Sequence, residues 1–349
     1  MDSHYFFIVL RFSTFVGLNF SMSSEIKKIA VLTSGGDSPG MNAAIRSVVR
    51  TCAYMKVDCV AIYRGYQGMI EGDFKPMDAR SVNNIINKGG TILKSARCDD
   101  FRTPEGRKKA HDELIKAGID AFVVIGGDGS FTGAMIFNRE FNFPVMGIPG
   151  TIDNDIFGTT FTLGFDTALN TVVECIDKIR DTASSHNRLF FVEVMGRDVG
   201  HIALNAGVGA GAEEILIPEE NLGLDRLLES LKRSKESGKS SSIVIVAEGD
   251  KSGKNVFELK EYVEEHLPIY DVRVSVLGHM QRGGSPSCYD RVLASRMGVK
   301  AVEALLEGKT NLMVGIQCNK LTLTPINKAI KGHTKIDKEL IRVSEIMTT

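Results

Sequence analysis

The sequence predicts an α/β protein whose sheets are mainly parallel. Uninterrupted apolar runs such as Ala121–Ile125, which are typical of buried parallel strands, alternate with helical segments along the chain. Several of these runs end in a glycine-rich turn that leads directly into a helix, and no hairpin-type turn separates two runs. Because parallel neighbours need a crossover between them, this alternation predicts a layered α/β sandwich.

The composition is ordinary for a soluble globular protein. The chain has 349 residues, enough for two domains or one large one, of which 43% are apolar and 24% charged. The net charge of −1 gives no electrostatic reason to expect a nucleic acid or a membrane surface as a partner. The six cysteines lack CxxC or CxxH spacing, which argues against zinc or a disulfide framework, so we expect reduced thiols in a cytoplasmic protein.

The amino-terminal segment fits neither a secretory signal nor a spanning helix. Its apolar stretch Tyr5–Leu10 is short, follows Asp2 and is interrupted at Arg11. We expect Met22 to be the true initiator, with a genuine extension as the alternative. In either case residues 1–25 are expected to lie outside the fold.

The first predicted strand, Lys28–Thr33, runs into the glycine-rich turn 34–40 and then into a helix over Met41–Tyr54. Such a turn directs backbone N–H groups and the positive end of the helix dipole toward a phosphate. It matches neither the dinucleotide-binding nor the Walker A pattern, so a tight turn that simply needs glycine is the alternative. Arg46 and Arg50 share a face of the helix, where they either face solvent or meet an anion.

Two further strands precede the next glycine-rich turn. Asp58–Tyr63 is followed by loops, of which residues 89–97 end in an arginine near two glycines. The Ala121–Ile125 run ends in the turn 126–130 before another helix. There the glycines allow a phosphate chain to approach the backbone, and Asp128 can hold a magnesium ion through its shell of waters.

The strand Phe143–Ile148 leads into the most polar of these turns, Pro149–Asp155, which contains two aspartates and a threonine. Taken alone, this stretch could be a solvated turn whose Asp and Asn side chains bond their own backbone. Together with the two glycine-rich turns, it predicts one cleft that binds a polyphosphate and a metal ion at the carboxyl ends of the strands.

The second half of the chain continues the alternation. A helix from Phe165, with Asp166 expected to cap it, precedes the strand Leu189–Val194, which leads to Arg197. Further strands are predicted over Ile215–Ile217 and Ser242–Glu248, and a charged amphipathic helix begins at Leu224.

The last predicted strand, Val272–Leu277, leads into the glycine-flanked loop 278–286. A lone histidine is more often structural than functional. Here, however, His279 lies three residues before Arg282, and an arginine can bond a phosphate through two N–H groups. The pair therefore indicates recognition of a phosphate ester.

Seven motifs, in order and with the expected spacing, make the chain similar to the bacterial 6-phosphofructokinase family over roughly residues 26–330. They are SGGDSPGMNAAIR (34–46), GGTILKSAR (89–97), GGDGS (126–130), PGTIDND (149–155), SSHNR (184–188), EVMGR (193–197) and LGHMQRGGSP (277–286). The resemblance implies two similar Rossmann-like, three-layer α/β domains with mainly parallel sheets. The larger, ATP-binding domain would comprise residues 26–164 and 277–327, and the smaller, fructose 6-phosphate-binding domain residues 165–276 and 328–349.

The resemblance also implies an enzyme of glycolysis, an ATP-dependent phosphotransferase. With Mg²⁺ it would move the γ-phosphoryl group of ATP to the 1-hydroxyl of fructose 6-phosphate, giving fructose 1,6-bisphosphate and ADP. Asp153 would be the general base, which takes the hydroxyl proton as the new O–P bond forms. Thr151, Asp155 and Arg197 would complete the catalytic set. A catalytically silent sugar-phosphate sensor is the alternative from another class, and loss of Asp153, Arg197 or Asp128 would have marked it.

The same motifs supply the expected binding residues. The nucleotide, with Mg²⁺ on Asp128, would contact Gly36, Arg97, Cys98, Gly127, Asp128, Gly129 and Ser130. The sugar phosphate would contact Thr151, Asp153, Met195, Gly196, Arg197, Glu248, His279 and Arg282, joined by Arg188 and Arg273 from a neighbouring subunit. A site shared in this way implies a homotetramer.

Two glycines favour ATP over pyrophosphate as the phosphoryl donor. Pyrophosphate-dependent enzymes that resemble this one carry aspartate where Gly129 stands and lysine where Gly150 stands. A side chain at the first position would obstruct the α-phosphate of a nucleotide, and a lysine at the second would neutralise charge on the transferring group. A pyrophosphate-dependent enzyme is therefore the alternative within the family.

The family's effector pocket, which binds ADP or phosphoenolpyruvate between subunits, matches this chain in part. The expected residues are Arg46, Arg50, Arg180, Glu213 and Lys239. Two cations usual in that pocket fall at Asp73 and Ser237, and an anion in a phosphate pocket weakens binding by repulsion. The response to an effector stays open.

Overall fold

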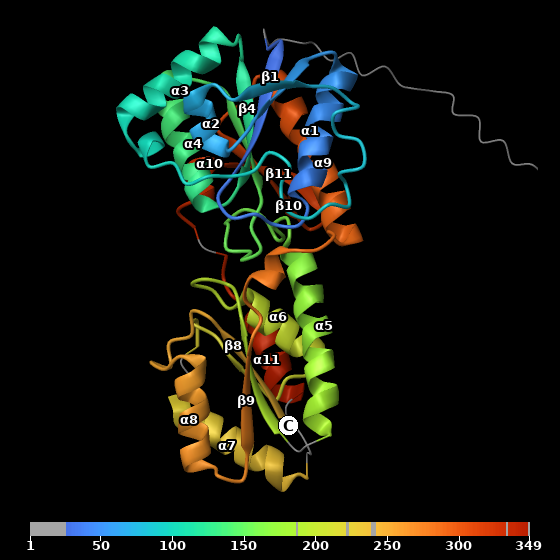
Figure 1. The fold of residues 1–349 in the computed structure, drawn as a ribbon, viewed down its shortest axis with the longest axis vertical. Helices are drawn as coiled ribbons and strands as arrows, with labels where there is room; N and C mark the ends of the chain where they lie inside the picture. Colours follow the sequence, from blue (N-terminus) through green and yellow to red (C-terminus); the bar gives the residue numbers. More distant parts are fainter. Residues whose placement is uncertain (1–25, 186–187, 221–222, 239–241, 333, 348–349) are drawn as a thin grey trace, which may run out of the picture.

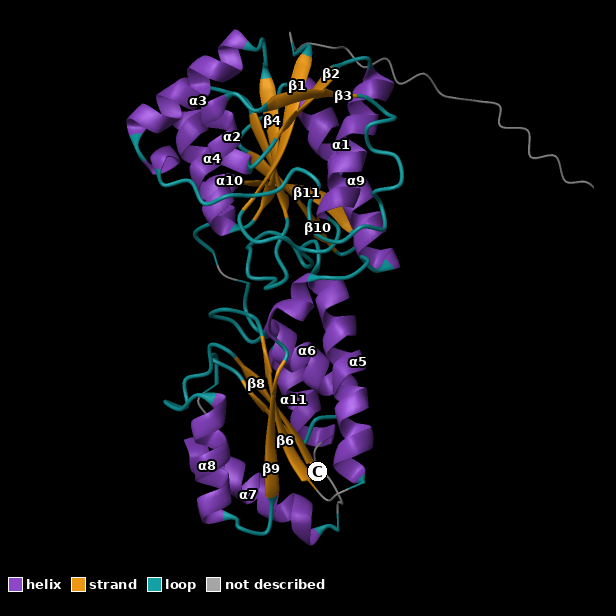
Figure 2. Cartoon of the chain, in the orientation of Figure 1, coloured by secondary structure: helices purple, strands orange, loops and turns teal. Residues whose placement is uncertain are grey.

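The computed structural model describes residues 26–185, 188–220, 223–238, 242–332 and 334–347. Its strands form two sheets, each with helices on both faces, so the predicted α/β class is confirmed (Figure 1). Figure 2 shows the two sheets as separate layers of strands, one above the other along the long axis of the molecule. None of the described helices is long and apolar enough to cross a membrane.

The seven-stranded sheet has the order β11-β10-β5-β4-β1-β2-β3. Its strands are β1 (Lys28–Ser34), β2 (Asp58–Ile62), β3 (Phe74–Met77), β4 (Ala121–Gly126), β5 (Val145–Pro149), β10 (Leu312–Gln317) and β11 (Lys320–Pro325). All neighbours pair in parallel except the edge strands β3 and β11. Where the sequence predicted a strand in this sheet, its bounds agree to about two residues.

Helices cover both faces of this sheet because alternate strand residues point to opposite sides. Val31 packs with the helices α1 (Met41–Met55) and α9 (Cys288–Leu306), whereas Leu32 packs with the helices on the other face. That second layer consists of α2 (Gly65–Glu71), α3 (Pro104–Lys116), α4 (Asp128–Phe141), α10 (Ile326–Ala329) and the short 3-10 turn η1 (Asp100–Arg102).

One expectation from the sequence is wrong, because the chain does contain a hairpin. Strands β10 and β11 run antiparallel, and Gln317 pairs with Lys320 across a two-residue turn. The turn residues Cys318 and Asn319 both have positive φ, 46° and 60°, as a type I′ hairpin requires. Cys-Asn lacks the glycine that usually signals this turn, which is why the sequence pattern did not reveal it.

The four-stranded sheet has the order β7-β8-β6-β9 and is parallel throughout. Its strands are β6 (Arg188–Val194), β7 (Glu214–Leu216), β8 (Ser242–Ala247) and β9 (Asp271–Val276). Val192 faces α5 (Phe165–Ser184), α6 (His201–Ala210) and α11 (Lys338–Met347), while Phe191 faces α7 (Gly223–Glu236) and α8 (Val256–His266). The 3-10 turn η2 (Gly278–Arg282) follows β9.

The start of α5 is held by a buried carboxylate from α9. Gly164 occupies the N-cap position, and Asp166 lies in the first turn and makes no cap bond, so the predicted capping residue is wrong. Instead, Asp290 accepts hydrogen bonds from the backbone N–H groups of Gly164 and Thr167, each at 2.9 Å, and from the Thr167 hydroxyl. Asp290 is fully buried, so the two helix starts are fastened together where the two sheet units meet.

Replacing Asp290 by alanine should destabilise the protein strongly. The Asp290→Ala variant leaves two buried N–H groups and a hydroxyl without their acceptor, and we expect the free energy of unfolding to fall by about 2–4 kcal/mol. Urea unfolding followed by circular dichroism measures this change. Asp225→Ala, which removes an exposed first-turn aspartate from α7, is the matched control and should change stability by less than about 1 kcal/mol. Equal midpoints for the two variants would contradict the capping role of Asp290.

Candidate active site

Three polar turns lie side by side at one edge of the seven-stranded sheet. Strands β5, β4 and β1 are neighbours, and their last residues Pro149, Gly126 and Ser34 are in register. Because all three strands are parallel, the turns that follow them start from the same row. The turns 34–40, 126–130 and 149–155 therefore begin side by side, at the edge of the sheet where the sequence predicts a cleft.

Asp153 is the most perturbed carboxylate of this cleft. It is 7% exposed, and its Oδ1 atom is buried without a hydrogen-bond partner among the described residues. Burial, together with the nearby charges of Asp155 and Glu248, raises the pKa of Asp153 to about 6, against the opposing effects of Arg282 and of a hydrogen bond with Thr151. A buried acceptor without a partner is rare in folded proteins, and here it lies among the three polar turns. The arrangement suits a general base that ionises near neutral pH.

The glycines of the two glycine-rich turns differ in how much space surrounds them. A Cβ atom on Gly36 would lie 2.5 Å from Nη1 of Arg282, so only glycine allows the arginine to lie against the first turn. In the second turn, Gly127 precedes the first residue of α4, Asp128, and Ser130 is buried. A Cβ on Gly129 would meet nothing within 4 Å, which leaves open space in front of this turn.

The loop that carries Arg97 and Cys98 is fastened to the end of β1 and to α1. Thr33 Oγ1 donates to the carbonyl of Lys94 at 3.0 Å, and the backbone N–H of Ile92 donates to Asn42 Oδ1 at 2.8 Å. Arg97 itself is exposed. Sequence patterns did not single out Thr33 and Asn42, because an isolated polar residue gives no periodic signal.

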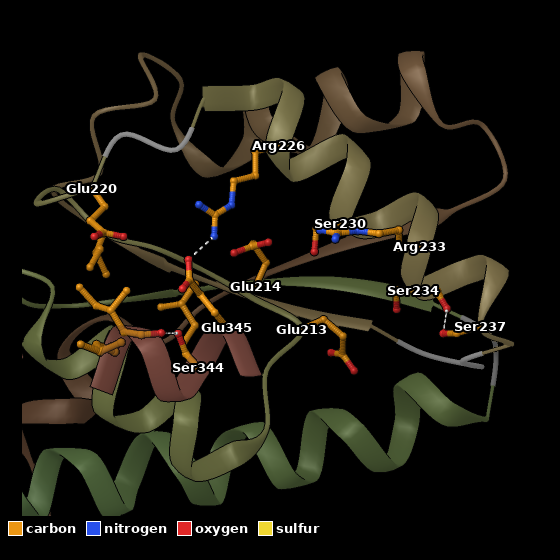
Figure 3. A pocket seen from close by; sticks show the side chains of 14 residues that line it. Glu213, Glu214, Glu220, Arg226, Ser230, Arg233, Ser234, Ser237, Ser344 and Glu345 are labelled. Carbon is orange, nitrogen blue, oxygen red and sulfur yellow. Dashed lines mark hydrogen bonds and ion pairs between the residues drawn. The ribbon is translucent and has the colours of Figure 1, made fainter. Parts of the chain in front are cut away.

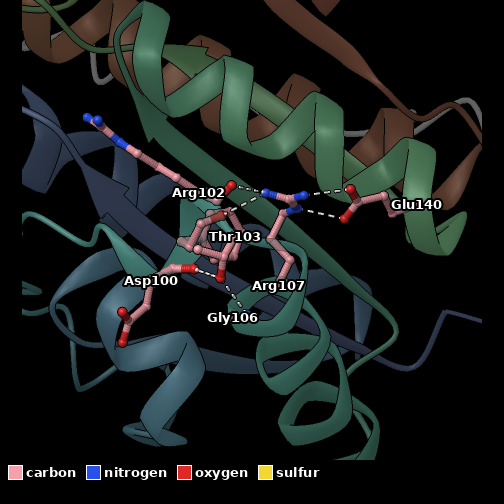
Figure 4. A network of polar contacts seen from close by, with 7 residues as sticks. Asp100, Arg102, Thr103, Gly106, Arg107 and Glu140 are labelled. Carbon is pink, nitrogen blue, oxygen red and sulfur yellow. Dashed lines mark hydrogen bonds and ion pairs between the residues drawn. The ribbon is translucent and has the colours of Figure 1, made fainter.

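An ion pair between the buried Arg107 and the exposed Glu140 holds the chain just after this loop (Figure 4). Arg107 donates to Glu140 through Nε at 2.6 Å and Nη2 at 2.7 Å, and through Nη1 to the carbonyls of Phe101 and Arg102. The ring of Phe101 stacks on Tyr66 with 4.0 Å between centroids, and the Tyr66 hydroxyl donates to the carbonyl of Ser130. This network connects the loop after Arg97 to the second turn, and the sequence did not reveal it because a buried arginine reads as a surface charge.

The expected sugar-phosphate residues gather at the carboxyl ends of β6, β8 and β9. The backbone N–H of Arg197 donates to Glu248 Oε1 at 2.7 Å, and that of Met195 donates to Gln281 Oε1 at 3.2 Å. Arg197 has a φ of 58°, which its side chain tolerates poorly, and its carbonyl packs so closely that a Cβ on Gly249 would lie 2.1 Å from it. Gln281, fully buried, is a structural member of this cluster that the sequence did not indicate.

The two groups of residues meet through the η2 turn. Arg282 Nη1 donates to the carbonyl of Asp37 at 3.3 Å, which connects the loop after β9 to the first glycine-rich turn. His279 lies on the same turn and is exposed. The influence of Arg282 and Glu248 on the pKa of Asp153 means that charges from both sheet units act on one carboxylate.

Arg188 and Arg273 lie away from this cluster. Arg188 is the first residue of β6, six residues before Val194, which corresponds to about 20 Å along a strand. Both arginines bond Asp271, Arg188 through Nε at 2.9 Å and Arg273 through Nη1 at 2.6 Å. Within one chain they are therefore not part of the cleft around Asp153.

The expected effector residues form two separate groups. Arg46 and Arg50 line a hollow of about 310 Å³ between α1 and α9. Arg180 and Glu213 lie in the other sheet unit, 3.8 Å apart, and Arg180 also donates to the carbonyls that end α6. Lys239 lies outside the described residues. Asp73 bonds Arg64 at 3.0 Å, so its negative charge is already paired.

A larger pocket of about 560 Å³ lies in the four-stranded unit, between β7, α7 and α11 (Figure 3). Glu213 and Ser237 line it together with other acids, serines and two arginines. Arg226 and Glu345 bond each other at 2.8 Å. This pocket is separate from the cleft that contains Asp153.

Among the described residues, no group of three or more His, Cys, Asp or Glu side chains is placed to hold a metal ion. The single carboxylate of Asp128 at the start of α4 instead fits a magnesium ion that takes its remaining oxygen ligands from phosphates and water.

Comparison with known proteins shows which protein family the chain is similar to. The family model described as Phosphofructokinase matches residues 28–305. The chain is 52% identical over 318 residues to "ATP-dependent 6-phosphofructokinase 2" of Bacteroides thetaiotaomicron, covering 91% of this chain and 97% of that protein. It is 54% identical over 320 residues to "ATP-dependent 6-phosphofructokinase" of Bacillus pumilus, covering 92% and 99%.

Solved structures share the fold. The phosphofructokinase of Saccharomyces cerevisiae superposes with a TM-score of 0.84 at 39% identity, and the match covers 92% of this chain and 46% of the yeast chain. A pyrophosphate-dependent phosphofructokinase from Marinobacter aquaeolei superposes with a TM-score of 0.80 at 21% identity, covering 90% and 86%. The second likeness concerns the fold alone.

Proposed function

The chain belongs to the phosphofructokinase family, and from this premise we propose that its cleft transfers the γ-phosphoryl group of ATP to the 1-hydroxyl of fructose 6-phosphate. Its activity is that of an ATP-dependent 6-phosphofructokinase, a kinase of glycolysis. The observation that carries the assignment of the site is the buried Oδ1 atom of Asp153, which finds no hydrogen-bond partner in the described part of the chain and lies where three turns begin side by side. A substrate hydroxyl that donates to this atom would satisfy it and lose its proton there.

Asp153 acts as the base, and most of the catalysis comes from position and charge. With a pKa of about 6, Asp153 is ionised at neutral pH and can accept the hydroxyl proton as the O–P bond forms. Thr151 and Asp155 line the same turn. Charge on the transferring group is offset by backbone N–H groups of the turns at Gly36 and 126–130 and by Arg97. These groups act by being correctly placed around the transferring phosphoryl group, and none of them has to react chemically.

Asp128 is the residue that would hold Mg²⁺, which neutralises phosphate charge when bound. Gly127, Gly129 and Ser130 would shape the nucleotide loop next to it, and Cys98, which follows Arg97 in the chain, would also contact the nucleotide. The open space at Gly129 supports a nucleotide in this position, because an aspartate there would project toward it. We assign ATP to the unit of residues 26–164 and 277–327.

Fructose 6-phosphate belongs to the unit of residues 165–276 and 328–349, with Arg282 and His279 reaching it from the connecting loop. Its phosphate would be bound by Arg282 and His279, and its sugar by Met195, Gly196, Arg197 and Glu248. The guanidinium of Arg282 can bond a phosphate through two N–H groups. Because Arg282 also bonds the carbonyl of Asp37, the group that would bind the sugar phosphate lies next to the first glycine-rich turn. The reacting groups therefore face each other across the cleft.

A second copy of the chain would complete the site. Arg188 lies about 20 Å along its strand from the cleft, and Arg273 lies three residues, about 10 Å, before the end of β9. Both bond Asp271 instead, so we assign them to the site of another subunit. We propose a homotetramer with shared active sites in the cytoplasm. ADP or phosphoenolpyruvate is the proposed effector between subunits, supported by the separation of Arg46 and Arg50 from Arg180 and Glu213.

The donor assignment is tested by a coupled assay of fructose 1,6-bisphosphate formation with Mg²⁺, with ATP and pyrophosphate in parallel. We expect activity with ATP alone. Gly129→Asp, whose side chain has room in the free protein, should lower the ATP-supported kcat/KM by at least about tenfold because it obstructs the α-phosphate. Pyrophosphate-supported activity would contradict the two-glycine argument, and inactivity with both donors would favour the sensor.

The role of Asp153 predicts a pH dependence. A base must be ionised, so kcat/KM for fructose 6-phosphate, which reports the free enzyme, should fall as the pH drops below about 6 and be flat above about pH 7. The charge of Asp155 raises the pKa of Asp153, so Asp155→Asn should move this acid limb to lower pH. The substrate phosphate also ionises near pH 6, but its pKa in solution is the same for both enzymes. An acid limb that stays in place would argue against Asp153 as the titrating base.

Shared sites predict complementation between inactive chains. Asp153→Ser removes the base and should lower kcat by about a thousandfold or more with nearly intact fructose 6-phosphate binding, whereas Arg273→Ala should mainly raise KM for this substrate. Co-expression should produce hybrids in which some sites combine an intact Asp153 with a partner's intact Arg273, and activity should return. Co-expression of the Asp153→Ser chain with an Arg282→Ala chain is the control. Both of these residues serve the cleft of their own chain, so no site in this mixture is intact and activity should not return. No recovery in the first mixture would contradict a shared site.

A further inference from the structure

Asn154 holds an uncommon backbone conformation between the two aspartates of the polar turn. Its φ is 55°, in the left-handed region that asparagine enters more readily than most residues other than glycine. The residue is 6% exposed. This local reversal sets the directions in which Asp153 and Asp155 leave the backbone.

The side chain of Asn154 fastens the turn to the chain that returns beside it. Nδ2 donates to the carbonyl of Thr160 at 3.1 Å, and Oδ1 accepts the backbone N–H of Thr162 at 2.9 Å. The Thr162 hydroxyl lies between the two segments and donates to the carbonyl of Thr151 at 2.6 Å. The amide of Asn154 and the hydroxyl of Thr162 thus bracket Asp153 from both sides.

Oδ1 of Asp153 is buried and has no hydrogen-bond partner among the described residues. The hydrogen bond that lowers the pKa of Asp153 comes from Thr151, which belongs to the same turn. The direction of the carboxylate therefore follows from the conformation of the turn. A carboxylate bonded to partners outside the turn would keep its position if the turn loosened, but Asp153 would not.

We propose that Asn154 is a positioning residue, which holds Asp153 in line with the reacting hydroxyl by fastening the turn to residues 160–162. The inference rests on the proposed function, in which Asp153 is the base. Asn154 touches no substrate in this account and acts only through its neighbour. Its effect should therefore appear in kcat and not in substrate binding.

The inference is tested with two substitutions of opposite effect. Asn154→Gly keeps access to positive φ but loses the amide bonds, and we expect kcat to fall about 100-fold with both KM values changed less than about threefold. Water then reaches Asp153 more easily, burial raises its pKa less, and the acid limb of kcat/KM moves to lower pH. Asn154→Asp keeps acceptors for Thr162 but adds a negative charge to those of Asp155 and Glu248, so the limb moves to higher pH.

Asn142→Gly is the matched control, because Asn142 also has a positive φ, 50°, but ends α4 outside the cleft. It should keep the parental kcat. A kcat for Asn154→Gly within twofold of that control, or an acid limb unmoved in both Asn154 variants, would overturn the proposal. If thermal unfolding shows that Asn154→Gly does not fold, kcat of Asn154→Asp above its acid limb decides, because aspartate cannot donate to the carbonyl of Thr160 and a parental kcat there would overturn the proposal. An inactive parent would contradict the proposed function instead.

Discussion

The parallel register of β1, β4 and β5 is the constraint on which the cleft depends. Because Ser34, Gly126 and Pro149 stand in one row, every residue that follows them starts from the same edge of the sheet. The backbone hydrogen bonds of three buried strands thus fix the starting points of the phosphate turns and of the base. A slip of one residue in any of these strands would turn its core side chains to the opposite face, so the row is strongly specified.

Charge balance around Asp153 follows from bringing the two sheet units together. Alone, the turn after β5 would hold the buried carboxylate of Asp153 close to the half-buried one of Asp155, which is unfavourable. Glu248 from the second unit adds to this repulsion, and Arg282 opposes it while also bonding the first glycine-rich turn. The cleft therefore keeps a carboxylate that ionises at neutral pH but is poorly solvated, which is what a base in this position needs.

The sequence allowed most of the strands and the polar turns that follow them to be predicted, because each carries a local signal: an apolar run, a cluster of glycines or a charged residue just after a strand. It did not reveal the partners that come from distant parts of the chain. Asp290, Arg107 and Gln281 look like ordinary surface residues until the fold buries them. The β10–β11 hairpin was missed for a different reason, since Cys318 and Asn319 adopt positive φ without glycine.

The hydrogen bond from Gly164 to Asp290 joins residues that lie 126 positions apart in the sequence, and this separation affects how the chain folds during its synthesis. The acceptor at the start of α5 does not exist until α9 has been made, and the seven-stranded sheet waits for β10 and β11 near the end of the sequence. During translation, both units therefore stay incomplete with apolar strands uncovered. Such late closure slows folding and favours aggregation of nascent chains, so chaperone assistance would benefit this protein more than one whose units each come from a continuous stretch.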